Sequence, residues 1–486
     1  MKNIYYFCAA CVCALSGCVS SPSDWGAGDV DVLLAERGHV VTHQNVHEEH
    51  DKFRAGQLTL DQALSLALNN SPTIRAAYSK LGYGVADVYQ GNRVRNPILS
   101  LSLLEPTNAG GVSRFSYGFL ASLTDLITLP ARKKFAEAEF VALQADVAAT
   151  IFNVVADAEY AYFDYATAYH LVLVRRRISQ AARIAAALGE QFFEAGNLPL
   201  KTLANLRATA AATKAALRSQ QATAEGARSA LANLLGVSAN SSWQIASQIK
   251  RPVVMADDLE SLLSLTEDSR LDLRAAKNRL EVLGARYGFT TKARWLGQLN
   301  VGAERERESD GEKLLGANLE WSLPIFNQGL DRQLRADAAF QVAEANLRLL
   351  ALSIENEVRA QSTALATASD RVTLLGETLI PALVVATEQA QKEQHYMLIG
   401  VFELLEVKQR EYLGVVNYFS ALRDYWLARA SLARAVGRVL PTVEPIKYEE
   451  VNLAALIQPT NADSNVALTH LKHHVEKSPN TIEATQ

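Results

Sequence analysis

The sequence predicts a mainly α-helical fold that also carries a membrane β-barrel part and is built as a duplicated half-molecule. The chain matches itself at an offset of about 200 residues, and four short segments alternate strictly between apolar and polar side chains. Long stretches carry apolar side chains at three- and four-residue steps. Alternation with a period of two is typical of strands, and the longer steps are typical of helices. Each half is therefore expected to hold the same elements in the same order.

The N-terminus predicts a secretory signal peptide over residues 1–17. Lys2 precedes an apolar run from Ile4 to Leu15, and small residues follow ahead of Cys18. A charged start, roughly 7–15 apolar residues and small residues before the cut describe such a peptide. The sequence LSGC at 15–18 also resembles a bacterial lipobox, which implies lipidation of Cys18 as the first mature residue. The alternative is an ordinary signal peptide with a chance cysteine.

All four cysteines lie within the first 18 residues. Only Cys18 would remain after cleavage, so no disulfide, redox pair or cysteine-based metal site is expected in the mature chain. Val19 follows the lipobox cysteine, whereas retention of such lipoproteins in the inner membrane usually needs Asp there. The resemblance therefore implies an outer-membrane lipoprotein that extends into the periplasm, with residues 18–57 as its lipidated N-terminal segment.

The composition excludes some partners. The net charge is −4 with 21% charged residues, which gives no basic field for nucleic acid. No run of about 18 apolar residues stands out beyond Cys18, so no transmembrane helix is expected. The mature chain would be anchored by lipid, by a β-barrel, or by both.

The self-match divides the chain into two repeats, residues 58–237 and 258–440, followed by a C-terminal tail at 441–486 that is expected to be partly disordered. A solenoid repeat of about 20–50 residues would be much shorter. Each repeat is predicted to open with a short helix, at 60–69 and 258–265, capped by Thr59 and by Asp257 or Asp258. A second helical stretch, two strands and a very long helical segment interrupted once are expected to follow. Matching positions include Leu60 with Leu259, Leu64 with Leu263, and Ile74 with Leu273.

The four alternating segments predict membrane strands. Leu99, Leu101 and Leu103 share a face opposite Ser100 and Ser102. The same alternation of apolar with polar or small residues is found at 115–123, 299–304 and 315–323. A half-buried strand of a soluble sheet is the alternative for any one segment, but four of them paired across polar loops (105–113 and 305–312) favour a membrane sheet. Four strands cannot close a barrel, and an open edge in hydrocarbon leaves backbone groups unpaired. Two copies would give about eight strands, and side chains fill the interior of a barrel of that size. Three copies would give about twelve strands and a wider lumen, so a channel requires a trimer.

The long segments predict coiled-coil-like helices. Residues 131–188 alone would extend roughly 87 Å at ~1.5 Å per residue, much longer than a membrane is thick. A step near 3.5 residues favours supercoiled packing. The stripes run through Phe140, Leu143, Val147, Ile151, Val154, Ala158, Tyr162, Tyr165 and Tyr169; through Phe340, Ala343, Leu347, Leu350, Ile354 and Val358; and through Tyr412, Val416, Phe419, Trp426, Ala430 and Ala433.

Two motifs resemble one known family. Residues 322–329 (SLPIFNQG) followed by a long helix are similar to the junction between β-barrel and α-barrel in the TolC-like outer-membrane efflux factors. Residues 58–68 (LTLDQALSLAL) are similar to that family's first helix, and the resemblance covers about residues 55–440. The barrel–helix junction would include Pro130, Pro324 and Gly329. The first-half junction at 124–130 (TDLITLP) departs from the family pattern and resembles the lipid-anchored and heavy-metal members.

The resemblance implies a homotrimer with a twelve-stranded barrel in outer-membrane lipid and a periplasmic helical tube. The tube would meet a periplasmic adaptor protein and an inner-membrane pump, which supplies the energy. The chain would then be a passive export channel rather than an enzyme, with no cofactor, and the sequence offers no phosphate-binding glycine loop, zinc-protease helix or nucleophile elbow. Metal cations are the favoured substrate. Drug efflux and type I protein secretion stay open as alternatives, as does a structural coiled-coil lipoprotein.

The periplasmic tips of the tube are expected at the turns around 194–199 and 395–400. Gly196, Asn197 and Gly400 would contact the adaptor, and both glycines suit a helix C-terminus that needs a positive φ. Glu403 and Glu406 follow the second turn. Family members often carry acidic residues at matching places, so these two are predicted to form the periplasmic gate, where three-fold repetition would favour cations. Two solvated glutamates on a helix are the alternative.

The histidines cluster outside the repeats. His39, His43, His47 and His50 would share one face of a helix, and His470, His473 and His474 lie in the tail. Neutral imidazoles at such spacing can bind copper or zinc. Polar flanking segments with incidental histidines are the alternative. The sequence thus predicts a metal site at the first four histidines.

Overall fold

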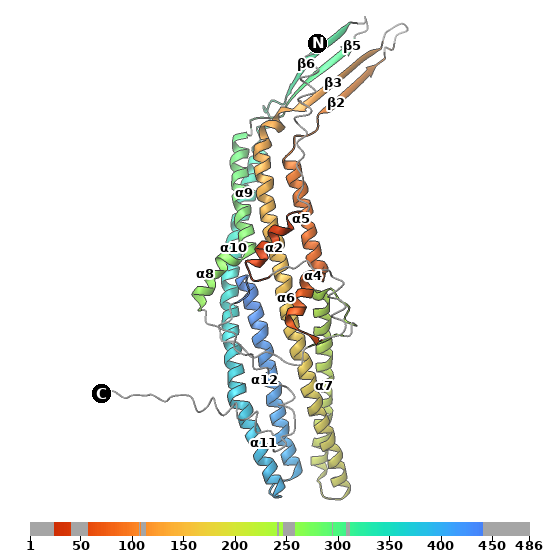
Figure 1. Cartoon of the computed structure of the whole chain (residues 1–486), viewed down its shortest axis with the longest axis vertical. Helices are drawn as coiled ribbons and strands as arrows, with labels where there is room; N and C mark the ends of the chain where they lie inside the picture. Colours follow the sequence, from red (N-terminus) through yellow and green to blue (C-terminus); the bar gives the residue numbers. More distant parts are fainter. Residues whose placement is uncertain are drawn as a thin grey trace, which may run out of the picture.

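The computed structural model describes residues 24–39, 57–105, 107, 113–240, 243–245, 258–293, 295–307 and 312–440. These residues form an elongated helical body with a four-stranded sheet projecting from one end (Figure 1). The helices and strands follow the predicted order in both halves. The first half holds α4 (Leu60–Asn70), α5 (Pro72–Gly91), β2 (Ile98–Leu104), β3 (Arg114–Ser122), α6 (Leu123–Glu194) and α7 (Leu200–Leu235).

The second half repeats this order with one change in its long helical segment. A π-helical turn, η1 (Leu374–Leu379), separates α10 from α11 and has no counterpart in α6. The tandem duplication predicted from the sequence is therefore visible in the structure. Its elements are α8 (Leu259–Ser269), α9 (Leu271–Ala293), β5 (Leu299–Arg307), β6 (Lys313–Trp321), α10 (Leu330–Thr373), η1, α11 (Ile380–His395) and α12 (Val401–Val436).

The first helix of each half begins at a side-chain cap. Thr59 and Gln62 form a capping box, in which the Gln62 N–H donates to Thr59 Oγ1 at 3.3 Å and the Thr59 N–H donates to Gln62 Oε1 at 3.0 Å. At α8 the N-cap is Asp258, whose Oδ1 accepts from the Ser261 N–H at 2.8 Å. Both predicted caps are confirmed, and each such cap stabilises a helix by about 1 kcal/mol.

The four strands form one antiparallel sheet in the order β2-β3-β5-β6. The register sets Leu101 opposite Tyr117, Phe119 opposite Ala303, and Val301 opposite Leu319. Two boundaries differ from the sequence prediction. Leu123 is the first residue of α6, because Ser122 caps that helix through the Asp125 N–H, and β5 extends to Arg307, which shortens the second loop.

Helix α6 runs the length of the helical body. Its 72 residues correspond to roughly 108 Å at ~1.5 Å per residue. One 18-residue window of α6 is long and apolar enough to span a membrane, with mean hydropathy 1.4, contrary to the sequence expectation. Half of that window is buried against other helices, as in the core helix of a bundle. The predicted apolar stripe of α6 forms much of this buried face.

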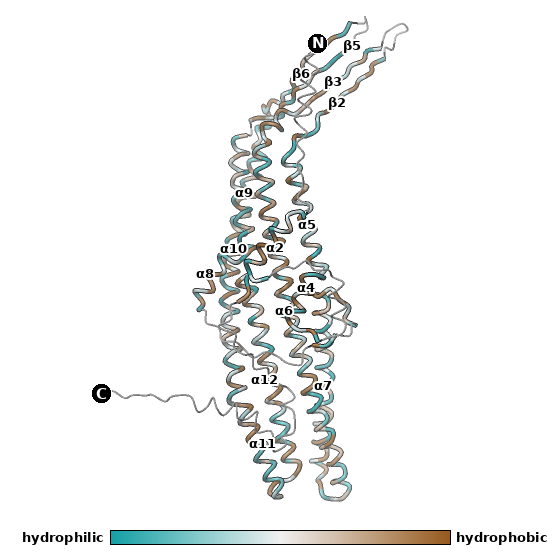
Figure 2. The backbone as a smooth tube through the Cα atoms, viewed as in Figure 1, coloured by the Kyte–Doolittle hydropathy of each residue, from teal (hydrophilic) through white to brown (hydrophobic). Residues whose placement is uncertain are grey.

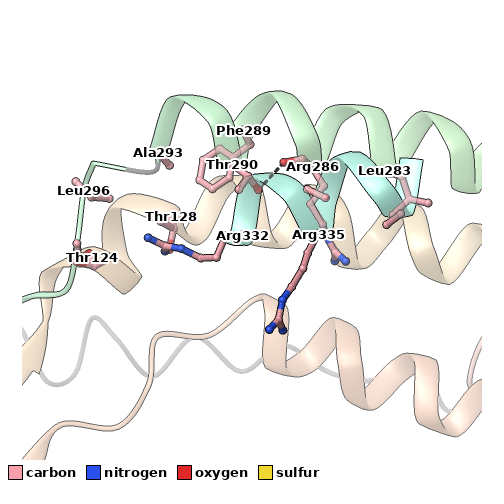
Figure 3. Close-up of a pocket in the computed structure, with 13 residues that line it drawn as sticks. Thr124, Thr128, Leu283, Arg286, Phe289, Thr290, Ala293, Leu296, Arg332 and Arg335 are labelled. Atoms are coloured by element: carbon pink, nitrogen blue, oxygen red, sulfur yellow. Dashed lines mark hydrogen bonds between the residues drawn. The ribbon is translucent and has the colours of Figure 1, made fainter. Parts of the chain in front are cut away.

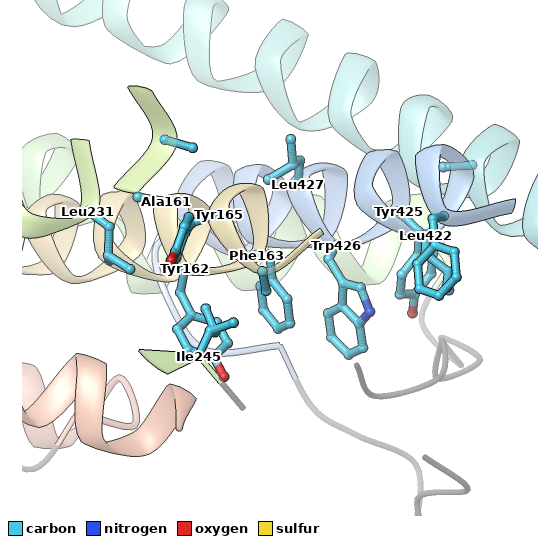
Figure 4. Packing of buried hydrophobic residues seen from close by; sticks show 14 of the residues in the cluster. Ala161, Tyr162, Phe163, Tyr165, Leu231, Ile245, Leu422, Tyr425, Trp426 and Leu427 are labelled. Carbon is cyan, nitrogen blue, oxygen red and sulfur yellow. The ribbon is translucent and has the colours of Figure 1, made fainter. Parts of the chain in front are cut away.

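The largest core cluster lies midway along the body, where α4, α6, α7 and α12 meet. The rings of Phe163 and Trp426 stack there with centroids 4.5 Å apart and an interplanar angle of 8° (Figure 4). A two-residue parallel pair, β1 (Gln57–Leu58) with β4 (Gln244–Ile245), adds Leu58 and Ile245 to the same cluster. This cluster joins the first half to the second.

A short helix near the N-terminus, α2 (Ala27–Ala35), also joins the halves. Gln144 of α6 donates to Asp29 Oδ2 at 2.8 Å. Arg37, just after α2, donates through Nε to the Ser269 carbonyl oxygen at 2.6 Å, and its own carbonyl accepts from the Val439 N–H at 3.1 Å. His39 packs edge-on against Phe152, with ring centroids 5.3 Å apart. The segment is therefore fixed to both repeats.

Acidification is expected to weaken the docking of this segment. Burial lowers the pKa of His39 from 6.5 to about 4. The unfolded chain therefore binds more protons between these two values, and stability falls as the pH decreases through that window. Full protonation would cost about 3 kcal/mol. Thermal unfolding at pH 7.5 and pH 4.5 measures the effect, and His39→Leu should reduce the difference between the two pH values. An unchanged difference in that variant would assign the pH dependence to other groups.

Candidate functional site

The sheet at the end of the body has one apolar face. Leu101 and Leu319 are 66% and 67% exposed in the single chain, and apolar and polar residues alternate along the strands (Figure 2). Exposed apolar area of this extent marks a surface that contacts lipid or another protein. The exposed apolar residues of this face are Leu99, Leu101, Leu103, Phe115, Tyr117, Phe119, Val301, Leu315, Leu319 and Trp321.

The opposite face of the sheet is mostly polar, with Ile98, Leu104 and Leu314 as exposed apolar residues near the strand ends. Arg114 pairs with Glu306 at 2.9 Å, and Asn300 donates to Glu320 Oε2 at 3.4 Å. Gly118 lies opposite Ser100 in the register. Strands β2 and β6 are the two edges within one chain, so their outer N–H and C=O groups have no strand beside them in the described part of the molecule. Such edges pair with further strands.

Within the residues that the structure describes, four ion pairs connect α6 to the second half, and together we call them the ion-pair ladder. Every carboxylate belongs to α6 and every guanidinium to α9 or α12. The side chains are partly exposed, so each pair contributes about 0–1 kcal/mol. Because the four pairs follow one another along α6, they nevertheless fix the position of the second half along this helix. The pairs are Glu139 with Arg286 at 3.5 Å, Asp146 with Arg279, Asp157 with Arg434 at 2.7 Å, and Asp164 with Arg423 at 2.6 Å.

The ladder occupies the face of α6 that points away from α2. Successive residues of a helix are rotated by ~100° around its axis, so the four acids point in nearly the same direction. That direction is roughly 150° around the axis from Gln144, the α6 residue that donates to Asp29 of α2. Thr124 and Thr128 lie on the same side as the acids. This face of α6 is therefore charged from Glu139 to Asp164, and the opposite face carries the N-terminal segment.

Two helix-to-helix turns form the far end of the body. At the first, Gly196 has φ +76°, and the Asn197 N–H donates to the Phe192 carbonyl at 2.8 Å. At the second, the Leu398 N–H donates to the Glu393 carbonyl at 2.8 Å, which is the same pattern. The left-handed residue there is Met397, with φ +59°. The prediction of a positive φ is confirmed for Gly196 and wrong for Gly400, which has φ −80° as the N-cap of α12.

These turns present apolar side chains to solvent. Met397 is 92% exposed, and Tyr396, Leu398 and Leu200 are also exposed. The rings of Phe192 and Phe402 meet edge to face at 5.8 Å, so the two turns lie side by side. The result is one exposed apolar tip formed by both halves.

The predicted gate residues lie on the first two turns of α12. Both carboxylates are exposed. Glu406 accepts a hydrogen bond from Arg410 at 2.9 Å, a helical i,i+4 ion pair that the sequence reasoning left out. Arg410 therefore offsets part of the negative charge at this position.

The two junctions between sheet and helices differ. In the first half β3 leads directly into α6, and Pro130 lies inside that helix. In the second half an irregular segment follows Trp321 and contains Pro324. Gly329 ends it with φ +74° as the N-cap of α10, and its N–H donates to Asn327 Oδ1 at 2.9 Å. Only the second junction therefore needs a glycine.

Several predicted residues lie outside the described part of the chain. These are Cys18, His43, His47 and His50, and the tail histidines. His39 is described, and it packs against Phe152. Among the described residues, no group of three or more His, Cys, Asp or Glu side chains could hold a metal ion.

A cavity of about 440 Å³ lies where the sheet meets the helices, a feature that sequence reasoning did not identify. Helices α6, α9 and α10 line it, and Arg332 reaches from α10 towards Thr128 of α6 (Figure 3). The charged lining residues are all arginines: Arg286, Arg332 and Arg335. We call this space the basic cavity. Its only hint in the sequence is the pair of arginines just after Gly329.

No protein-family model and no curated protein sequence matches the chain. Solved structures do. The Campylobacter jejuni CmeC outer membrane channel superposes with a TM-score of 0.66 at 16% identity, covering 79% of this chain and 87% of that one. The outer-membrane channel OprN superposes with a TM-score of 0.65 at 18% identity, covering 83% of this chain and 95% of that one. The open state of the Neisseria gonorrhoeae MtrE outer membrane channel superposes with a TM-score of 0.61 at 17% identity, covering 78% of this chain and 89% of that one. The predicted fold class is thereby confirmed.

Proposed function

We propose that the protein is the outer-membrane channel of a tripartite efflux system, a passive conduit from the periplasm or an inner-membrane pump to the exterior. The observation that carries this proposal is the four-stranded sheet with one apolar face, one polar face and two open edges, set at the end of a long helical body. Such a sheet suits lipid on one side and water on the other. The proteins of the same fold are outer-membrane channels, which supports this use of the sheet.

The open edges support assembly as a homotrimer. Backbone groups left unpaired in hydrocarbon cost several kcal/mol each, so β2 of one copy would pair with β6 of the next. Three copies would give twelve strands around a lumen lined by the polar face. The ladder face of α6 would then continue the polar lining into the helical tube.

Two measurements on purified, detergent-extracted protein test this proposal. Its mass should correspond to three copies, and its addition to a planar bilayer should produce stepwise ion conductance. A stable monomer with intact β-structure, or a trimer without conductance, would contradict the channel assignment.

Outer-membrane anchoring through Cys18 is part of the proposal. Cys18→Ser should abolish incorporation of radioactive palmitate, because it removes the only thiol expected in the mature chain. Cys8→Ser, within the predicted signal peptide, is the matched control and should label normally. Continued labelling of Cys18→Ser would mean that the acyl chains are attached elsewhere.

The apolar tip supports a periplasmic adaptor as partner, with Gly196, Asn197 and Gly400 at or beside the contact. An exposed surface of this kind, formed by Tyr396, Met397 and Leu398, is suited to a helical partner with an apolar end. The adaptor in turn would connect the conduit to an inner-membrane pump. Crosslinking from a cysteine introduced at Asn197 should capture such a partner in intact cells, whereas one introduced at Ser100 in the sheet should not.

Metal cations are the proposed substrate, supported by the spacing of His43, His47 and His50, and drug efflux or type I secretion are the alternatives. His39, which packs against Phe152, is left out of this set. Cells lacking the protein should then lose tolerance to copper or zinc rather than to drugs. Loss of drug tolerance alone would favour the first alternative.

Glu403 and Glu406 are proposed to ring the periplasmic entrance. Replacing both with Gln should reduce cation selectivity in bilayer recordings, because six carboxylates of a trimer would lose their charge. The reduction should be modest, since Arg410 already offsets Glu406. Glu344→Gln, a paired glutamate on α10, serves as control. Unaltered selectivity in the double variant would place the constriction elsewhere on the helices.

A further inference from the structure

The first three turns of α6 carry an exposed face that the ion-pair ladder does not use. Leu126 and Ile127 are 50% and 52% exposed, and Pro130 and Lys134 are also exposed. At ~100° per residue, Leu126, Pro130 and Lys134 lie roughly 140–180° around the helix axis from Glu139. They therefore lie opposite the ladder, on the face that forms the exterior of the tube in the proposed function.

The side chains of this face change from apolar to basic along the helix. Leu126 and Ile127 lie at the end of α6 that joins β3. Lys133 and Lys134 come two turns later, about 10 Å farther from the sheet. Lys133 lies 3.8 Å from Glu137, and Lys134 has no acidic partner among the residues that the structure describes. Apolar residues followed by lysines are typical of a boundary between membrane and water.

Other elements bring aromatic rings and cations to the same junction between sheet and helices (Figure 1). Arg93, just after α5, lies over the Tyr89 ring at 4.0 Å from its centroid. In the second half, Lys292 is exposed in the last turn of α9, and Trp321, the last residue of β6, is 54% exposed. Tryptophan and tyrosine are enriched where a membrane protein leaves the hydrocarbon layer.

The positive charge of this junction is not balanced within the first half. Residues 91–97 and 123–134 hold a single acidic residue, Asp125, which Arg95 contacts at 2.6 Å. Arg132 donates to the backbone carbonyls of Arg93 and Asp125. The exposed cations that remain for an outside partner are Arg93, Lys133 and Lys134.

We propose that these three cations, which we call the basic collar, bind the phosphate groups of anionic phospholipids in the periplasmic leaflet of the outer membrane. Lysine and arginine can bury their apolar stems while the charged group stays at the headgroups. Leu126 and Ile127, nearer the sheet, would contact the acyl chains. Each cation close to an anionic lipid surface strengthens the attraction. This inference rests on the proposed channel function, and it adds the position on the helical body at which the membrane ends.

Native mass spectrometry of the detergent-extracted protein tests the lipid preference. The probes are dioleoyl phosphatidylglycerol and dioleoyl phosphatidylcholine, which share their acyl chains and differ in headgroup charge. The collar variant combines Arg93→Gln, Lys133→Gln and Lys134→Gln. The control variant removes three exposed cations of α7, away from the sheet, by Lys201→Gln, Lys214→Gln and Arg218→Gln.

The unaltered protein and the control variant should retain phosphatidylglycerol in preference to phosphatidylcholine. The collar variant should lose at least about tenfold of that preference, because three attractive charges are gone. Equal retention of both lipids by the unaltered protein, or the same preference in both triple variants, would overturn the proposal.

Cysteine labelling in intact cells tests where the leaflet lies. The reagent is a charged maleimide that enters the periplasm but does not partition into lipid. Ile127→Cys should be shielded from it, whereas Val141→Cys, on the same face and ~21 Å farther along α6, should react. The two native side chains are similarly exposed in the single chain, at 52% and 47%. Equal labelling of the two cysteines would contradict a membrane boundary at the collar.

Bilayer recordings separate this inference from the channel assignment. The collar variant should conduct like the unaltered protein, because its altered residues lie outside the conduit. If no form of the protein conducts, the proposed function fails whatever the lipid measurements give. If all forms conduct and the collar variant keeps its preference for phosphatidylglycerol, the channel stands and the collar is wrong.

Discussion

Arginine at positions 101 and 319 is expected to keep the protein out of the outer membrane. Leu101 and Leu319 lie on the apolar face of the sheet and are about two-thirds exposed in the single chain, at 66% and 67%. An arginine on the lipid face of a membrane sheet costs about 2–4 kcal/mol near the bilayer midplane. Leu101→Arg with Leu319→Arg would repeat that cost in every copy of the assembly. The helical body should still fold, because neither residue belongs to its core.

The matched control moves the same charges to the other face. Ser102→Arg with Asn318→Arg changes the polar face of the same two strands and should insert normally. Membrane fractionation followed by immunoblotting measures the amount in the outer membrane. Equal recovery of both double variants would mean that the apolar face does not contact lipid.

Removing the Trp426 ring should destabilise the helical body by about 3–5 kcal/mol. Trp426 is 5% exposed and stacks on Phe163, so Trp426→Ala leaves a cavity where the two halves meet. The expected result is a lower midpoint of unfolding in denaturant, followed by helical circular dichroism, together with lower amounts of protein in cells.

Trp426→Phe serves as the conservative comparison because it keeps an aromatic ring against Phe163 and should cost less than half as much. Trp25→Ala, at a half-exposed tryptophan, should change the midpoint little. If Trp426→Ala and Trp426→Phe unfold at the same denaturant concentration, the stacked pair does not stabilise the contact between the halves.

Local patterns predicted most of the fold. The helix caps at Thr59 and Asp258 and the four alternating strands depend on residues close in sequence, so one chain was enough to find them. Strand β3 ends at Ser122, one residue before the predicted end at residue 123, because the Ser122 side chain caps α6 and begins the helix at Leu123. The sequence predicts a positive φ at Gly400, because glycine is the residue that adopts it most readily. In the structure Met397 has the positive φ instead, because the hydrogen bond from the Leu398 N–H to the Glu393 carbonyl places the left-handed residue at position 397.

The site was harder to predict because its groups are far apart in the chain. Asp146 and Arg279 are separated by 133 residues, and Asp157 and Arg434 by 277. No local spacing marks such a pair. The basic cavity likewise needs three helices to be placed before its arginines converge. The sequence shows the carboxylates on one face of α6, but it does not show which arginines of α9 and α12 pair with them.

The ion-pair ladder has a consequence for the symmetry of the proposed trimeric tube. In the repeat, Phe140 of α6 corresponds to Phe340 of α10. At this offset, the α10 positions matching Glu139, Asp146 and Asp164 hold Ala339, Asn346 and Ala364, so α10 lacks three of the four acids. Duplicated halves could in principle give a trimer six equivalent contacts around its axis. In the proposed trimer, the contact within each copy would carry these charges, and a contact that α10 makes with a neighbouring copy would lack three of the four acids. The tube would therefore have three-fold rather than six-fold symmetry, and raised salt should loosen only alternate boundaries.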